Sequence, residues 1–167
     1  MTVLDAGFSS EGAHPTEWAE GRQKLEAAEV FWLSTVRPDG RPHVTPLLSV
    51  WCADGMYFCT GPDERKAKNL KRNQRCILTT GRNTLDEGLD VVVEGHVAKV
   101  RVKSELEQVA STYESKYGEH LTDPEGTWFG LGETIRRGEV LVYRLTPTTV
   151  LGFVKGKQFS QTRWRFV

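Results

Sequence analysis

Residues 31–73 constrain the fold more than any other part of the chain, because short apolar segments alternate there with turn sequences. Residues 31–36 and 56–60 are rich in β-branched and aromatic residues and predict strands, with a longer strand between them over residues 42–51. The Arg37-Pro-Asp-Gly40 sequence predicts a hairpin turn, since proline fixes φ, aspartate bonds its own backbone and glycine accepts positive φ. This stretch therefore predicts antiparallel strands joined by tight turns.

A short basic helix is expected directly after these strands. Gly61-Pro-Asp63 ends the sheet, and Asp63 can cap a helix over residues 64–72 whose first turn contains Arg65 and Lys66. Cations in a first turn oppose the helix dipole, at a cost of about a few tenths of a kcal/mol each, unless an anion binds there. A solvated basic face is the alternative explanation. A strand end, a glycine turn and two cations together predict a phosphate-binding site.

The rest of the chain predicts more strands and two longer helices. The expected strands are residues 76–80, 90–102 (with a bulge or a close neighbour at Gly95), 141–146, 149–154 and 162–167. The expected helices are residues 16–28 and residues 104–117, the second of which ends at Gly118. Residues 120–138 carry Trp128 and Phe129 and are expected as a loop, long enough for a lid or an interface segment.

This pattern predicts a mainly β (α+β) protein. Antiparallel hairpins dominate without the βαβ alternation of a parallel sheet, so a small closed barrel with helices packed outside it fits best. The 167 residues are enough to bury a core. We expect residues 1–13, rich in glycine and serine, to be a flexible, poorly ordered lead-in, and residues 14–167 to form a single domain.

Composition argues against several classes of protein. Lys plus Arg and Asp plus Glu number 22 each, so no basic excess attracts nucleic acid. No segment has the ~18 consecutive apolar residues of a membrane span, and residues 1–13 do not form a signal peptide. Cys52, Cys59 and Cys76 match no metal or redox spacing, which favours a cytoplasmic protein without a metal site. The histidines are scattered, and no nucleophilic triad is visible.

The C-terminal tail contains an unusual cluster. The Arg163-Trp164-Arg165 sequence places an indole between two guanidinium groups. Such a cluster suits an interface, or the stacking of a planar ring that carries negative charge. The alternative is a terminal strand that buries Trp164 and leaves both arginines outside. A tail strand that closes a pocket would use Trp164 as an apolar wall.

The sequence from residue 30 to residue 100 resembles the pyridoxamine phosphate oxidase-like superfamily of split β-barrels. The resemblance rests on the two hairpins and on a gapless match that includes Thr60, Arg65, Lys66, Ala67 and Asn73. The ending Ser-Gln-Thr-Arg-Trp-Arg-Phe is similar to that of a branch of flavin- and deazaflavin-dependent oxidoreductases. The resemblance implies a split β-barrel of antiparallel strands with peripheral helices. It also implies a homodimer with two cofactor sites at its interface.

The same resemblance implies which residues lie at the cofactor. Those beside the ring are the strand residues Val44, Thr45, Pro46, Leu47, Leu48 and Ser49. Thr60, Arg65 and Lys66 are implied at the phosphate, with Cys59 and Asn69 also in the site. Asp90 is implied near the ring, and the tail residues Arg163, Trp164 and Arg165 in the site of the same or the partner subunit.

Departures from the oxidases narrow the implied function. The oxidases hold FMN with an arginine and a lysine where this chain has Val44 and Ser49, and have a glutamine where it has Asp90. Their Arg-Leu-x-Pro ending is absent, so a true pyridoxamine phosphate oxidase is not expected. The hypothesis is an oxidoreductase that uses deazaflavin coenzyme F-420 or FMN for hydride transfer to or from a small organic substrate. The alternative is a non-catalytic protein that binds or stores a flavin, a haem-type pigment or another planar anion.

Overall fold

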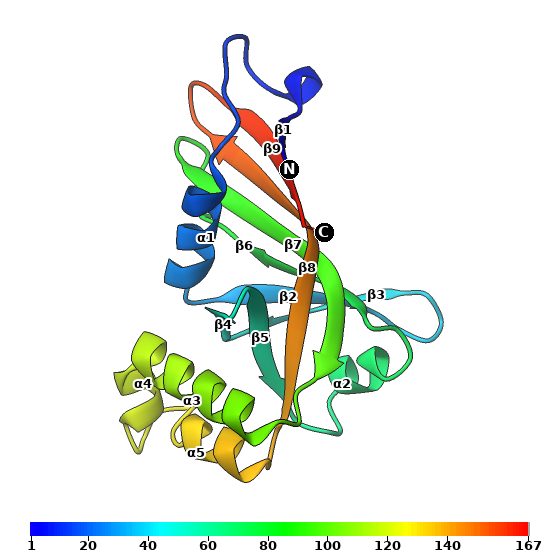
Figure 1. Cartoon of the computed structure of the whole chain (residues 1–167), viewed down its shortest axis with the longest axis vertical. Coiled ribbons are helices and arrows are strands. Elements are labelled where there is room, and N and C mark those ends of the chain that lie inside the picture. Colours follow the sequence, from blue (N-terminus) through cyan, green and yellow to red (C-terminus); the bar gives the residue numbers. More distant parts are fainter. Residues whose placement is uncertain (167) are drawn as a thin grey trace.

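The computed structural model describes residues 1–166 and is built around antiparallel strands (Figure 1). The strands are β1 (Thr2–Leu4), β2 (Phe31–Val36), β3 (Pro42–Leu47), β4 (Ser49–Cys52), β5 (Gly55–Thr60), β6 (Arg75–Thr80), β7 (Gly88–Lys99), β8 (Leu141–Lys155) and β9 (Ser160–Arg165). The helices are α1 (Trp18–Ala27), α2 (Arg65–Leu70), α3 (Lys103–Tyr117), α4 (Glu119–Thr122) and α5 (Leu131–Arg137), with a 3-10 turn, η1, at Ala6–Phe8.

The long strand β8 organises the sheet. The order of the main sheet is β1-β9-β8-β7-β6-β2-β3, and β8 also pairs with β5, which in turn pairs with β4. Within residues 1–166, β1 and β3 pair with one neighbour each, so the sheet is bent but not closed. The predicted mainly β split barrel with peripheral helices is therefore confirmed, whereas the closed barrel is wrong.

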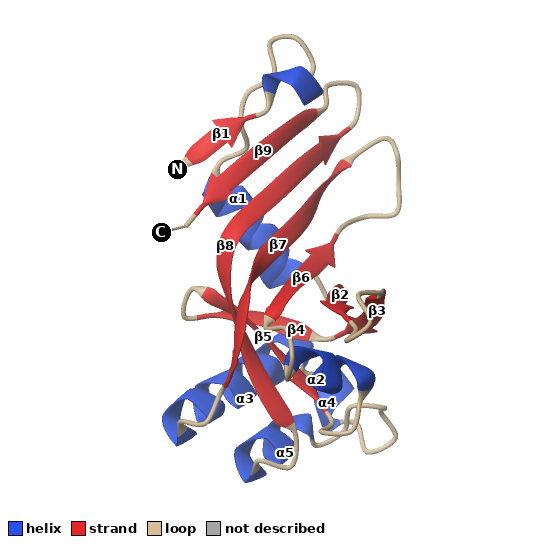
Figure 2. Cartoon of the chain, turned by 90° about the vertical axis from the view of Figure 1, so that its right-hand side faces the viewer, coloured by secondary structure: helices blue, strands red, loops and turns tan. Residues whose placement is uncertain are grey.

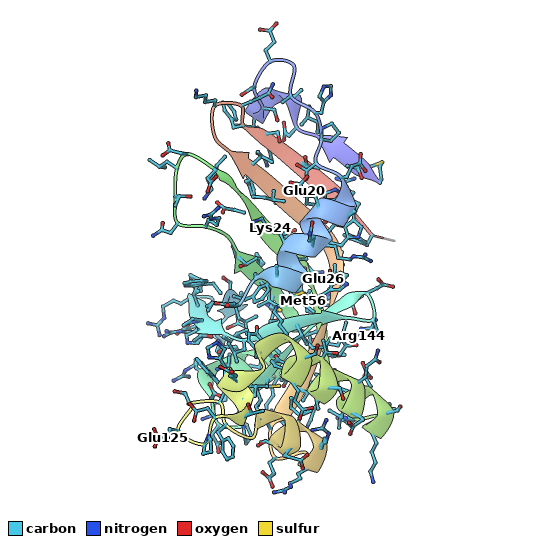
Figure 3. All side chains as sticks on the ribbon, turned by 90° about the vertical axis from the view of Figure 1, so that its left-hand side faces the viewer. Glu20, Lys24, Glu26, Met56, Glu125 and Arg144 are labelled. Carbon is cyan, nitrogen blue, oxygen red and sulfur yellow. The ribbon has the colours of Figure 1, made fainter. Side chains whose placement is uncertain are left out.

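Helices cover the two ends of the sheet differently. Helix α1 lies across one face of the part of the sheet that contains β7, β8 and β9. Figure 3 views the molecule from the α1 side and labels the α1 residues Glu20, Lys24 and Glu26. Helices α3, α4 and α5 gather at the opposite end, beside β4 and β5 (Figure 1). Two clusters of buried side chains follow this division. One joins α1 to the sheet and includes Leu25 and Trp164, and the other joins α3 to β4 and β5.

Two predicted stretches are divided into strands differently from the prediction. The strand expected over residues 42–51 is interrupted at Leu48, because β3 pairs with β2 while β4 pairs with β5. The two strands expected over residues 141–146 and 149–154 form one strand, β8, because β7 pairs with residues on both sides of the expected gap. Both features considered at Gly95 are present: the β7–β8 register shifts between Glu94 and Gly95, and a Cβ on Gly95 would lie 2.1 Å from the Thr146 carbonyl oxygen.

The segment expected as a loop over residues 120–138 contains α4 and α5. Gly130 and Gly138 flank α5 with φ of 73° and 69°, a left-handed conformation that suits glycine and lets the chain reverse. Arg136 of α5 donates to Glu107 of α3 at 3.0 Å and to Glu114 at 2.6 Å. These contacts between helices distant in the sequence hold a segment that local propensity does not predict as helical.

The N-terminal residues are more regular than the predicted lead-in. Strand β1 pairs with β9, with Val3 opposite Arg163, and the Asp5 N–H donates to the Gln161 carbonyl at 2.8 Å. The expected tail strand over residues 162–167 is largely β9, and Val167 lies outside the described residues. The lead-in gains its structure from β9, because an edge strand offers free N–H and C=O groups for pairing.

Candidate cofactor pocket

A pocket of about 300 Å³ lies where β3, β5, α2 and α3 meet the segment before α5. The pocket brings together several of the predicted site residues, namely Pro46, Leu47, Leu48, Cys59, Thr60 and Lys66. The other residues around it are Gly61, Glu64, Tyr113, Trp128, Leu131 and Val140. One side is apolar and the end near α2 is polar, an arrangement typical of small-molecule sites.

The apolar side is shaped by the break between β3 and β4. The Leu48 carbonyl leaves the sheet at this break and accepts a hydrogen bond from the Tyr113 hydroxyl at 3.0 Å. The next residue, Ser49, is fully buried, and its hydroxyl donates to the Tyr57 carbonyl at 2.8 Å. Ser49 is therefore part of the core, while Leu47 and Leu48 face the pocket. Val44 is more than half exposed and does not line it.

The polar end is formed by α2 and the turn before it. Lys66 is only 8% exposed, and its ammonium group pairs with the Glu64 carboxylate. The Gly61 N–H donates to the other carboxylate oxygen of Glu64 at 2.6 Å. Helix α2 is shorter than predicted, and Glu64 rather than Asp63 occupies its N-cap position, without a side-chain capping bond. The predicted cation is present at the pocket, but in contact with a carboxylate of the same chain.

Further polar groups lie between α2 and the β2–β3 hairpin. Asn69 is fully buried and donates to the Thr35 hydroxyl at 2.9 Å, while its side-chain oxygen has no partner within residues 1–166. The Thr45 hydroxyl likewise has no partner in this described part. Burial lowers the pKa of His43, and the nearby cations, Arg65 among them, lower it further. Arg65 itself is exposed and does not line the pocket.

Two titratable side chains of the pocket, Cys59 and Tyr113, are held protonated. Burial raises the pKa of the Cys59 thiol to about 12, although a hydrogen bond with Tyr113 opposes this. Burial also raises the pKa of Tyr113 well above its usual value. A thiol with such a pKa is a poor nucleophile at neutral pH. The pocket therefore offers binding and shielding from water rather than nucleophilic catalysis by Cys59.

Asp90 lies on β7, away from this pocket. Its carboxylate forms an ion pair with Lys155 at 3.1 Å and accepts the Arg82 N–H at 3.1 Å. A Cβ on Gly81 would lie 2.1 Å from an oxygen of Asp90, so the carboxylate packs closely on this turn. Within one chain, Asp90 organises the turn between β6 and β7.

The tail residues also lie away from the pocket, in the upper half of the sheet (Figure 2). Trp164 is 2% exposed, and its indole N–H donates to the Thr16 carbonyl at 3.0 Å. Its ring packs edge-on against Trp18 at 5.5 Å between centroids. Arg165 is exposed, and Arg163 lies 4.0 Å from Asp5. Within one chain, Trp164 thus attaches α1 to the sheet, as in the alternative considered for the tail.

Comparison with known proteins places this geometry in a family. The model of the family described as pyridoxamine 5'-phosphate oxidase matches residues 18–152. The chain belongs to this family. It is 29% identical over 107 residues to the pyridoxine/pyridoxamine 5'-phosphate oxidase of Christiangramia forsetii, an alignment that covers 63% of this chain. The chain spans about half (49%) of the length of that curated relative.

Solved structures share the oxidase-family fold at low identity. A heme-binding protein from Mycobacterium smegmatis matches with a TM-score of 0.67 and 13% identity, over 89% of this chain and 58% of that one. An FAD-binding protein from Mesorhizobium loti matches with a TM-score of 0.58 and 18% identity, over 89% of this chain and 96% of that one. At these identities the likeness concerns the fold.

Several pocket residues were missed by sequence reasoning. Tyr113 belongs to the apolar stripe of α3, and its sequence position gives no sign that its hydroxyl reaches Leu48. Trp128 lies in the segment singled out as a lid or interface, and it is 45% exposed at the pocket. Figure 3 shows Glu125 of the same segment at its outer end. A tryptophan in a long connecting segment was the sequence signal that could have identified this side of the pocket.

Two larger cavities lack the predicted residues. One of about 350 Å³ lies beside Trp32 and Arg82, and one of about 410 Å³ lies beside Lys116, whose ammonium donates to the Ser49 carbonyl at 2.9 Å. Neither is lined by a residue predicted for the cofactor. Within residues 1–166, no group of three or more His, Cys, Asp or Glu could hold a metal ion. Nor is any described helix long and apolar enough to cross a membrane.

Proposed function

We propose that this pocket binds a flavin-type cofactor, deazaflavin coenzyme F-420 or FMN, and that the protein is an oxidoreductase. The observation that supports this most strongly is the position of Lys66, a nearly buried cation at one end of an apolar pocket, in a chain of the pyridoxamine 5'-phosphate oxidase family. A buried cation needs an anionic partner, and the Glu64 carboxylate that pairs with Lys66 here is half exposed, so a ligand anion could take its place. An anionic cofactor group at Lys66 and a planar ring along Leu47 and Leu48 would satisfy both ends of the pocket.

The bound cofactor would supply hydride transfer to or from a small organic substrate. The residues of this chain would bind, orient and shield it. Lys66 and the Thr60 hydroxyl would hold the anionic group, since charge-assisted hydrogen bonds are the strongest of their kind. Leu47, Leu48 and Leu131 would exclude water from the ring. Val44 and Ser49 stand where the oxidases have the two cations that hold FMN, and the loss of these FMN-specific cations favours F-420 over FMN.

We also propose that the protein is a homodimer through the sheet face opposite α1. Figure 2 shows this face of β7, β8 and β9 in front, with α1 behind. On its continuation, Trp32 of β2 is 48% exposed, and Val36 and Val44 are exposed as well. Trp32 lies opposite Pro46, which also lines the pocket. A second copy on this face would therefore border the pocket, which could place Asp90 and the tail arginines in a shared site.

If the protein is a homodimer, we expect light scattering to give a mass of twice 18.8 kDa that does not change with protein concentration. Obligate dimers generally bury about 2,000 Å² or more, so a charge at the centre of the interface should be disruptive. Trp32→Glu should give a monomer, whereas Phe8→Glu, at an exposed apolar residue of η1, should leave the dimer intact. A wild-type monomer at micromolar concentration would contradict both the dimer and the shared site.

The alternative function is non-catalytic binding or storage of a planar anion such as haem. The fold shared with the heme-binding protein from Mycobacterium smegmatis supports keeping this alternative. It would use the same pocket and the same cation. The two functions differ in turnover, because a carrier binds its ligand without exchanging electrons with a substrate.

The visible spectrum of the purified protein, followed by titration with FMN, F-420 and haemin, tests the proposal. We expect saturable binding of F-420 or FMN, with tighter binding of the one that the protein uses. Reoxidation of the reduced cofactor should then depend on added substrate and on the protein. Tight binding of haemin with no binding of either flavin would support storage instead.

A further inference from the structure

The anion-binding end of the pocket already holds an anion of the chain itself. One oxygen of the Glu64 carboxylate accepts the Gly61 N–H at 2.6 Å, and the other pairs with the Lys66 ammonium. A backbone N–H and a lysine ammonium directed at the same group are what a phosphate or carboxylate ligand requires. The Glu64 carboxylate is therefore placed as a ligand anion would be.

These contacts are not explained by the usual role of a residue at this helix position. Glu64 occupies the N-cap of α2, but its side chain makes no capping hydrogen bond to the helix backbone. Its side chain turns back to the preceding turn, so closely that a Cβ on Gly61 would lie 3.3 Å from the carboxylate. The Glu64 side chain is 49% exposed, whereas that of Lys66 is 10% exposed. Glu64 can thus move into water at little cost, while Lys66 stays at the pocket.

We propose that Glu64 is an internal competitor for the anionic group of the ligand. An incoming phosphate would displace the Glu64 carboxylate from Gly61 and Lys66, and Glu64 would turn outward. This inference rests on the proposed function of the pocket. The exchange of one anion for another keeps Lys66 paired in both states, so neither state buries an unpaired charge. The ligand would bind more weakly than in an empty site and would exchange more readily with solution.

The charge of Glu64 can be removed without changing its shape. Glu64→Gln should strengthen FMN binding about 3- to 10-fold, since a half-exposed ion pair is modest in energy and the repulsion between carboxylate and phosphate is also lost. Riboflavin, which has the same ring and no phosphate, should bind both proteins equally. Asp63→Asn is the matched control, because it removes an adjacent exposed charge that does not contact Lys66.

Two results would overturn the competition. One is unchanged or weaker FMN binding in Glu64→Gln, which would mean that Glu64 only positions Lys66 or does nothing. The other is an equal gain in Asp63→Asn, which would mean a general charge effect. The proposed function is tested separately by Lys66→Ala. If Lys66→Ala loses FMN affinity while Glu64→Gln matches wild type, the pocket stands and only the competition fails.

An NMR titration with inorganic phosphate gives a second measurement that needs no flavin. The amide resonance of Gly61 should move as phosphate replaces the Glu64 carboxylate. Saturation should occur at a phosphate concentration about 3- to 10-fold lower in Glu64→Gln than in wild type. A Gly61 amide that does not respond in either protein, or that responds identically in both, would overturn the inference.

Discussion

Replacing Trp164 with alanine should lower the free energy of unfolding by about 3–5 kcal/mol, the usual cost of removing a buried tryptophan. The indole is almost fully buried and donates its N–H to the Thr16 carbonyl, so its loss leaves both a cavity and an unpaired backbone acceptor. Urea denaturation followed by circular dichroism measures the change. Arg165→Ala, one residue later and exposed, should change stability by no more than ~0.5 kcal/mol.

The same site should be intolerant of added volume. A Cβ on Gly152 would lie 2.4 Å from the Trp164 ring, and one on Gly21 would lie 3.0 Å from it on the α1 side. Because the ring lies between two glycines, Gly152→Ala should also be strongly destabilising. Equal stability of Trp164→Ala and Arg165→Ala would contradict the assignment of Trp164 to the core.

The tail variants also separate its two proposed roles. If Trp164 only attaches α1 to the sheet, the folded fraction of Trp164→Ala should bind cofactor as wild type does. A loss of affinity well beyond the loss of folded protein would instead support a tail that forms a wall of the site, within one subunit or across a dimer. Removal of Gln161–Val167 applies the same test to the whole tail.

Lys66→Ala should weaken cofactor binding by ~10- to 100-fold. A charge-assisted hydrogen bond to a nearly buried ammonium contributes about 1.5–3 kcal/mol, and the variant also leaves Glu64 without its cation next to the incoming anion. Fluorescence titration with FMN or F-420 measures the effect. The variant should stay folded, because its partner Glu64 is half exposed and can take up water in place of the lysine.

Lys71→Ala is the control for Lys66→Ala. Lys71 is an exposed lysine at the C-terminal end of α2 and does not line the pocket. Lys71→Ala should therefore leave the dissociation constant of the cofactor within about twofold of the wild-type value, since salt screens a solvated charge that lies outside the pocket. A dissociation constant within threefold of wild type for Lys66→Ala, or an equal loss for Lys71→Ala, would refute the anion site.

Much of the local structure is determined by the sequence alone. The hairpin strands β2 and β5, the basic α2, and α3 with its end at Gly118 follow from residue type and spacing within a few positions. Lys66 was identifiable as a candidate binding cation for the same reason, since the strand, the glycine turn and the cation are adjacent in the chain. Short-range sterics and hydrogen bonding act over such distances, so a local sequence pattern is sufficient to predict them.

Only the tertiary structure decided what these elements contact. Leu48 interrupts an apparently continuous strand because its two halves pair with different partners, and Tyr113 reaches it from α3. Trp164 is enclosed by Gly21 and Gly152, which are far from it in the sequence, so residue type could not distinguish a core side chain from a pocket wall. The burial of a side chain and the pairing of a strand depend on packing between segments that are distant in the sequence. The residue pattern of one segment does not specify which other segment packs against it.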